Sequence, residues 1–197
     1  PYVILKGAAS AAYYPDPIMR AMGDVDFIID SKDVERACKV LEEKGFKRNP
    51  KEHEKHIVYF DETGHYEMHI TPAGVPKGEK GDKVRDLLKD IIADSREYEM
   101  DFGIIRVPSD FHHGLVILLH TCCHLTSEGI GLRQLCDWAT FVSQFSDEKF
   151  CEIFEDKLKS AGLWKFAQVL TQVSVKCFGC PEHSWTGVED TELTQGI

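Results

Sequence analysis

Two aspartates one residue apart open an apolar segment at positions 23–30 (GDVDFIID), and no other pattern constrains the fold as strongly. The apolar residues predict a β-strand. Because side chains of a strand alternate between its two faces, Asp24 and Asp26 lie on the same side. Two carboxylates so close repel each other unless a cation lies between them, and hard divalent cations such as Mg²⁺ prefer oxygen ligands. A solvated turn can show the same short motif, so its interpretation depends on the rest of the chain.

The charge balance limits the classes of molecule that we expect the protein to bind. The 197 residues include 23 basic and 33 acidic side chains, for a net charge of −10. Nucleic acid is therefore disfavoured as the main partner, because it requires a basic face. Nucleotides remain compatible, since Mg²⁺ bridges acidic protein groups to phosphate oxygens.

Features that the sequence lacks indicate the cellular compartment in which we expect the protein. No apolar run is long enough to span a bilayer, and no signal peptide is visible. The seven cysteines are scattered without the spacing of a disulfide framework. We therefore expect a cytoplasmic protein without a membrane partner.

The chain starts at Pro1, directly before a strand and without an initiator methionine. This start predicts a fragment of a longer protein. Missing segments of the same chain, or a protein partner, would then complete the function.

The first elements predict an anion site. Residues 2–5 read as a buried strand and residues 8–13 as a helix, so Gly7 lies at a strand-to-helix turn. Backbone N–H groups at a helix start attract anions, Gly7 allows close approach, and Ser10 adds a hydroxyl. A small-residue helix that packs tightly on the sheet is the alternative for Ala8. Arg20 either binds phosphate or balances the charge of Asp24.

A third carboxylate follows in a predicted hairpin of residues 56–60 and 65–70. His65, Glu67 and His69 alternate with Tyr66, Met68 and Ile70, so these two sets face opposite sides. Glu67 either faces solvent or joins the Asp-x-Asp strand as a third acid.

The order of elements predicts an α+β fold, with a mixed β-sheet and flanking helices followed by a helical subdomain. We place the domain boundary after residue 107, which gives an α/β domain at 1–107 and helices at 108–197. The helical part carries His120 and His124 at a spacing of i, i+4, and Arg133 and Asp137 one turn apart. The tail after residue 180 reads as irregular.

These motifs, in this order, resemble the polymerase-β-like nucleotidyltransferase superfamily, and more closely its group of uncharacterised nucleotidyltransferases. That group carries a Lys-Gly-Ala turn, an Arg before Asp-x-Asp, a Glu-x-His strand, paired His and an Arg-x-x-x-Asp step. The matching residues here are Lys6-Gly7-Ala8, Arg20, Asp24 and Asp26, Glu67 and His69, His120 and His124, and Arg133 and Asp137. Classical members have Gly or Ser where this chain has Ala8, so Ser10 is a candidate substitute.

The resemblance implies a metal-dependent nucleotidyltransferase. Asp24, Asp26 and Glu67 would bind Mg²⁺ (or Mn²⁺), and Lys6, Gly7, Ala8, Ser10 and Arg20 would contact a nucleoside triphosphate such as ATP. His69, His120, His124, Arg133 and Asp137 would line the cleft. The enzyme would move NMP to a hydroxyl of a small molecule or protein and release pyrophosphate.

Two other functions stay open. The same fold can serve as a non-catalytic nucleotide-binding or protein-interaction module. A helical metal-binding protein is the third hypothesis, using His120, His124 and thiols, for which Cys177, Cys180 and His183 offer a further group.

Overall fold

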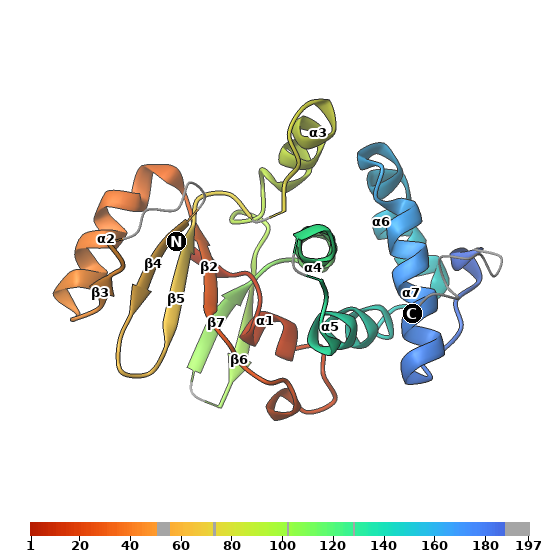
Figure 1. Ribbon diagram of the computed structural model, residues 1–197, viewed down its shortest axis with the longest axis horizontal. Helices are drawn as coiled ribbons and strands as arrows, with labels where there is room; N and C mark the ends of the chain where they lie inside the picture. Colours follow the sequence, from red (N-terminus) through yellow and green to blue (C-terminus); the bar gives the residue numbers. More distant parts are fainter. Residues whose placement is uncertain (51–55, 73, 102, 128, 188–197) are drawn as a thin grey trace. The chain divides into compact units, whose positions relative to one another are not determined.

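A computed structural model describes residues 1–50, 56–72, 74–101, 103–127 and 129–187 (Figure 1). Its mixed sheet and helices confirm the predicted α+β class. The chain forms two compact units, which we describe separately. The first comprises residues 1–73 and 88–116, and the second residues 74–87 and 117–197. The expected domain boundary after residue 107 stays a prediction.

The first unit is built on a five-stranded sheet with the order β1-β2-β5-β4-β3. Strands β2 and β5 are parallel, whereas the other neighbouring strands are antiparallel. The strands are β1 (Tyr2–Ile4), β2 (Val25–Ile29), β3 (Lys47–Arg48), β4 (His56–Phe60) and β5 (His65–His69).

Helix α2 (Val34–Glu43) follows a short 3-10 turn, η2 (Ser31–Asp33), and packs on one face of the sheet. Its partly buried side chains meet a core of Ile29, Tyr59 and Met68. The helix ends at Glu43, and Gly45, two residues later, turns the chain away with φ +90°. The predicted alternation in β5 is confirmed at Met68, which is buried on this face.

A second cluster joins β1 to a hairpin formed by β6 (Arg96–Met100) and β7 (Gly103–Val107). Ile4, Ile105 and Val107 are buried there beside Ala9 of α1 (Ala8–Ala11). Helix α1 is shorter than the predicted segment 8–13, and the 3-10 turn η1 (Pro17–Met19) follows it.

The second unit is helical, as expected. Its elements are α3 (Glu79–Leu88), α4 (Asp110–Ser127), which begins in the first unit, α5 (Leu132–Val142), α6 (Asp147–Ala161), α7 (Trp164–Phe178) and η3 (Ser184–Thr186). Trp138 of α5 is fully buried beside Phe141 and Phe150. Its Nε1 donates a hydrogen bond of 2.9 Å to Oγ1 of Thr171. Burial of this aromatic cluster stabilises the unit.

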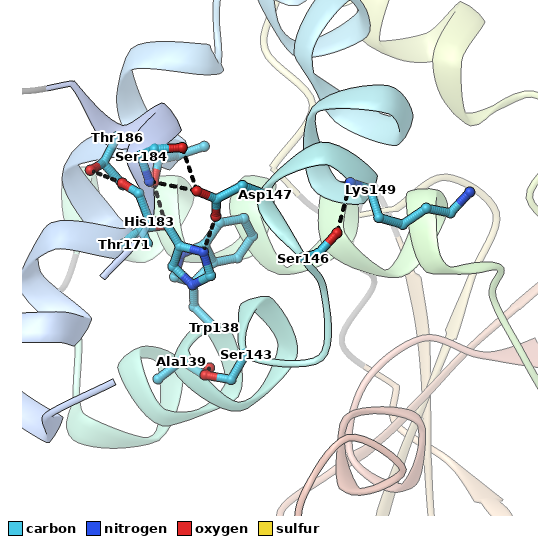
Figure 2. A network of polar contacts seen from close by, with 11 residues as sticks. Trp138, Ala139, Ser143, Ser146, Asp147, Lys149, Thr171, His183, Ser184 and Thr186 are labelled. Carbon is cyan, nitrogen blue, oxygen red and sulfur yellow. Dashed lines mark hydrogen bonds and ion pairs between the residues drawn. The ribbon is translucent and has the colours of Figure 1, made fainter. Parts of the chain in front are cut away.

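The segment after residue 180 is irregular up to residue 187 apart from η3, as expected, and polar contacts tie it to α6 (Figure 2). The carboxylate of Asp147, at the start of α6, accepts hydrogen bonds from the backbone N–H and the hydroxyl of Ser184, and its Oδ1 lies 2.7 Å from Nδ1 of His183. Trp185 stacks on Phe150 with ring centroids 4.3 Å apart. Residues 188–197 lie outside the described part.

Candidate active site

The parallel pair β2–β5 brings two of the predicted acids together. Asp26 lies directly opposite Glu67 in the register of the two strands. Because paired residues of neighbouring strands point to the same face, the two carboxylates share one side of the sheet. Asp26 is buried, whereas Glu67 keeps 26% of its side chain exposed.

An ammonium group and an imidazole ring contact the carboxylate of Asp26. The Nζ atom of Lys6 lies 3.1 Å from Oδ1, and Nε2 of His69 lies 2.8 Å from the same oxygen. The Nε2 atom of His69 also lies 3.4 Å from Oε2 of Glu67. The sequence predicts that His69 lines the cleft, and in the structure its Nε2 lies between the two acids.

These contacts set the protonation of the cluster. Burial raises the pKa of Asp26, but the hydrogen bond with His69 and the charge of Lys6 outweigh it and lower the pKa to about 2. The hydrogen bond with His69 also lowers the pKa of Glu67. Burial lowers the pKa of His69, while its bonds to the two acids raise it more, so the net shift is upward. Both acids are therefore ionised at neutral pH.

Asp24, the first acid of the motif, stands just before β2 with 55% of its side chain exposed. Its Oδ1 lies 3.9 Å from Nδ1 of His65, which opens β5. Asp24 is therefore the solvent-facing member of the acidic set, and Asp26 is the buried one.

The predicted anion turn has the backbone geometry that only glycine adopts easily. Gly7 has φ +64° and precedes α1. A Cβ atom added there would lie 3.2 Å from Cε of Met22 and 3.9 Å from Nη1 of Arg20. The guanidinium of the buried Arg20 is thus beside this turn.

Ser10 is placed less favourably for a ligand. Its side chain is buried in α1, and its hydroxyl has no hydrogen-bond partner among the described residues. Helix α1 has four residues, so its dipole is small. An anion at this turn would depend on the backbone of Gly7 and Ala8 and on the nearby cations.

His56 is a member of the cluster that sequence reasoning missed. It faces His69 directly across the antiparallel pair β4–β5. Its Nε2 lies 3.8 Å from Oε1 of Glu67. Ligand atoms of His56, Glu67 and His69 all lie within 4.8 Å of one another. The register of the hairpin was the signal that could have found it.

The opposite face of the sheet is apolar. An open pocket of about 410 Å³ lies between the sheet and α2, with Ile4, Val25, Phe27 and Leu41 in its lining. Since side chains alternate along β2, this pocket faces away from Asp26.

The remaining predicted residues belong to the second unit. His120 and His124 are neighbours on α4, with their Nε2 atoms 3.0 Å apart. On α5, Arg133 is exposed and Asp137 is buried. Within the described residues, His56, Glu67 and His69 are the one group of three or more His, Cys, Asp or Glu close enough to hold a metal. The roles of these four helical residues stay predictions.

Comparisons with known proteins agree with this fold. A family model described as "Uncharacterised nucleotidyltransferase" matches residues 1–179. An antigenic nucleotidyltransferase-like protein from Paracoccidioides brasiliensis superimposes with a TM-score of 0.50 at 14% identity, over 89% of this chain and 84% of that one.

A second solved structure is also similar. The lincosamide antibiotic adenylyltransferase LnuA, solved with lincomycin bound, has a TM-score of 0.49 at 14% identity, over 74% of this chain and 87% of that one. No curated protein sequence matches the chain significantly. Among the described helices, none is both long and apolar enough to cross a membrane.

Proposed function

Because the chain belongs to the uncharacterised nucleotidyltransferase family, we propose that it transfers a nucleoside monophosphate from an NTP, such as ATP, to a hydroxyl group. The acceptor would be a small molecule or a protein, and a divalent cation, Mg²⁺ or Mn²⁺, would assist. The hydroxyl oxygen would form a bond to the α-phosphorus, the bond to the β-phosphate would break, and pyrophosphate would leave.

The observation that carries this proposal is the pairing of Asp26 with Glu67 on β2 and β5. Two ionised carboxylates side by side on one face of a sheet are costly unless cations accompany them. Lys6 supplies positive charge beside Asp26, and His69 contacts both carboxylates. Asp24 lies two residues before Asp26, and the alternation of side chains along an extended chain puts both on the same side.

The donor set fits a hard divalent cation. Asp24, Asp26 and Glu67 offer carboxylate oxygens, and the exposure of Asp24 and Glu67 leaves room for water and phosphate ligands. These three residues would hold the ion. When bound, it would neutralise charge on the phosphates and orient them for in-line attack.

The protein groups have separate tasks in this proposal. Glu67 is ionised and partly exposed, so it can accept the proton of the attacking hydroxyl. The backbone of Gly7 and Ala8 would bind phosphate oxygens, with the guanidinium of Arg20 and the ammonium of Lys6 near them. Catalysis would come from positioning and electrostatics, without a covalent enzyme intermediate.

The test is transfer of label. The whole chain is incubated with each α-labelled NTP and Mg²⁺ in the presence of candidate hydroxyl acceptors, and pyrophosphate release is followed in parallel. Asp26→Asn keeps the shape of the side chain and removes its charge, so we expect a loss of about 10²- to 10³-fold in the rate of transfer. Asp90→Asn changes an exposed acid of the same unit and should leave the rate unchanged.

Transfer that survives Asp26→Asn would contradict the mechanism. A rise in melting temperature with an NTP and Mg²⁺, without label transfer or pyrophosphate release from any NTP, would favour the non-catalytic nucleotide-binding module instead. The circular dichroism spectrum of Asp26→Asn checks that the variant is folded.

A further inference from the structure

The two histidines beside Glu67 make the acidic site chemically unusual. His69 is 2% exposed, and 21% of the His56 side chain is accessible. Both rings lie on the same face of the sheet as Glu67, since His56 pairs with His69 and Glu67 lies two residues before His69. The cluster therefore offers two imidazole nitrogens and a carboxylate to one point.

The separations match those of ligands around one ion. Nitrogen and oxygen ligands lie about 2.0–2.2 Å from Zn²⁺, so two ligands of the same ion are roughly 3–3.6 Å apart. The Nε2 atom of His69 is 3.4 Å from Glu67, and Nε2 of His56 is 3.8 Å from Glu67. All three ligand atoms lie within 4.8 Å of one another, so binding of one ion would require side-chain rotations that draw them closer.

The donor types also distinguish this group from the carboxylate set. Mg²⁺ favours oxygen ligands, whereas imidazole nitrogen suits Zn²⁺ and related transition metals. Two histidines and one glutamate, with a water at the fourth position, form a known type of zinc site. Asp26, whose Oδ1 lies 2.8 Å from Nε2 of His69, is placed to contribute a further oxygen once a metal replaces the proton on this nitrogen.

We propose that His56, Glu67 and His69 form a binding site for a transition-metal dication of the Zn²⁺ class, which differs in its metal preference from the all-oxygen Mg²⁺ set of Asp24, Asp26 and Glu67. A role of this site in catalysis rests on the proposed function, because Glu67 belongs to both sets of metal ligands. The binding itself depends only on the three ligands. The proposed enzyme would thus carry one oxygen-only position and one nitrogen-rich position that share Glu67.

The experiment titrates the metal-free whole chain with Co²⁺ as a spectroscopic probe, without nucleotide and with Mg²⁺ in large excess. We expect one equivalent of Co²⁺ to bind, with the intense ligand-field absorption of a four- or five-coordinate ion. His56→Gln should weaken the binding by about 10- to 100-fold. His65→Gln removes an exposed imidazole from the same hairpin and should leave the spectrum unchanged.

Three results would overturn the proposal: no binding by the wild-type chain, equal binding by His56→Gln, or a thiolate charge-transfer band, which would assign the ion to cysteines. Should His56→Gln fail to fold, Glu67→Gln takes its place, because it keeps the side-chain shape and removes a ligand. Label transfer with Mg²⁺ alone, but without Co²⁺ binding, would reject this site and leave the proposed function standing. Co²⁺ binding without label transfer would do the reverse.

Discussion

Lys6 and His69 approach the same oxygen of one acid, Oδ1 of Asp26, at 3.1 and 2.8 Å. Lys6 follows β1 and His69 ends β5, so the buried carboxylate is contacted by a nitrogen group from the side of each neighbouring strand. A metal ion that bound this oxygen would compete with these two contacts. The first prediction follows from this competition.

Replacing Lys6 by methionine should have opposite effects on two ligands. Without the ammonium, Asp26 is freer to bind a cation, so Mg²⁺ alone should bind more tightly, on the order of fivefold for about 1 kcal/mol. The complex of Mg²⁺ with an NTP should bind more weakly, because a phosphate partner is lost. Calorimetric titration of Lys6→Met measures both affinities.

Lys6→Arg is the matched control, since it keeps the positive charge. It should preserve the wild-type order of the two affinities. Weaker binding of Mg²⁺ alone by Lys6→Met would show that the Lys6–Asp26 pair does not compete with the metal.

Gly7→Ala should impair nucleotide binding beyond its effect on folding. The left-handed backbone of Gly7 costs about 1–2 kcal/mol for a residue with a Cβ, and that Cβ would press on Met22 beside the phosphate turn. Thermal unfolding measures the strain, and titration with an NTP and Mg²⁺ measures the binding.

Gly45→Ala separates these two effects. Gly45 also has a positive φ, +90°, but nothing lies within 4 Å of an added Cβ there. This variant should lose similar stability and keep its affinity for nucleotide. An equal loss of affinity in both variants would mean that Gly7 has no direct part in the site.

The sequence predicts which residues form a strand better than it predicts which strands pair with one another. The alternation in positions 65–69 correctly predicts that Glu67 and His69 lie on the face opposite to Met68. Side chains of any strand alternate between its two faces, so this feature depends on the local sequence alone. The parallel pairing of β2 with β5 could not be read this way. It joins segments about forty residues apart, and many pairings satisfy the same local pattern.

The same distinction explains the site. Asp24, Asp26 and Glu67 were found from a motif, whereas the Lys6–Asp26 contact depends on where the chain leaves β1. The position of His56 could have been predicted from the sequence. The turn after Phe60 fixes each antiparallel pair of the hairpin and sets His56 opposite His69. The roles assigned to these residues remain predictions.

A buried histidine should make stability depend on pH. His113 is fully buried and stacked on Tyr13, and burial, with the charges of Arg96 and Arg20, lowers its pKa to about 3. The folded state resists protonation while the unfolded state accepts a proton near pH 6.5. Stability from this residue is therefore complete above pH 6.5 and is lost as pH falls from 6.5 toward 3.

Urea unfolding at pH 7 and pH 5 measures this effect. The wild-type chain should lose about 2 kcal/mol more than His113→Phe between these two values. His65→Gln, at an exposed position, should keep the wild-type difference. An identical pH difference in wild type and His113→Phe would show that His113 is not the group responsible.

The bond between Trp138 and Thr171 should stabilise the helical unit (Figure 2). Trp138→Phe leaves the hydroxyl of Thr171 without this donor, and Thr171→Val leaves the indole N–H without its acceptor. Each should cost about 1–3 kcal/mol. A double-mutant cycle by urea unfolding should give a coupling of roughly 1 kcal/mol, and additive effects would contradict the assignment.

Trp185 lies beyond residue 179, where the match to the family model ends, yet it is 9% exposed and stacked on Phe150. A chain cut after Gly179 would retain every family motif and still leave the ring of Phe150 facing water, with Asp147 deprived of His183 and Ser184. Recombinant versions trimmed to the family match should therefore aggregate sooner than versions that extend through Gly187.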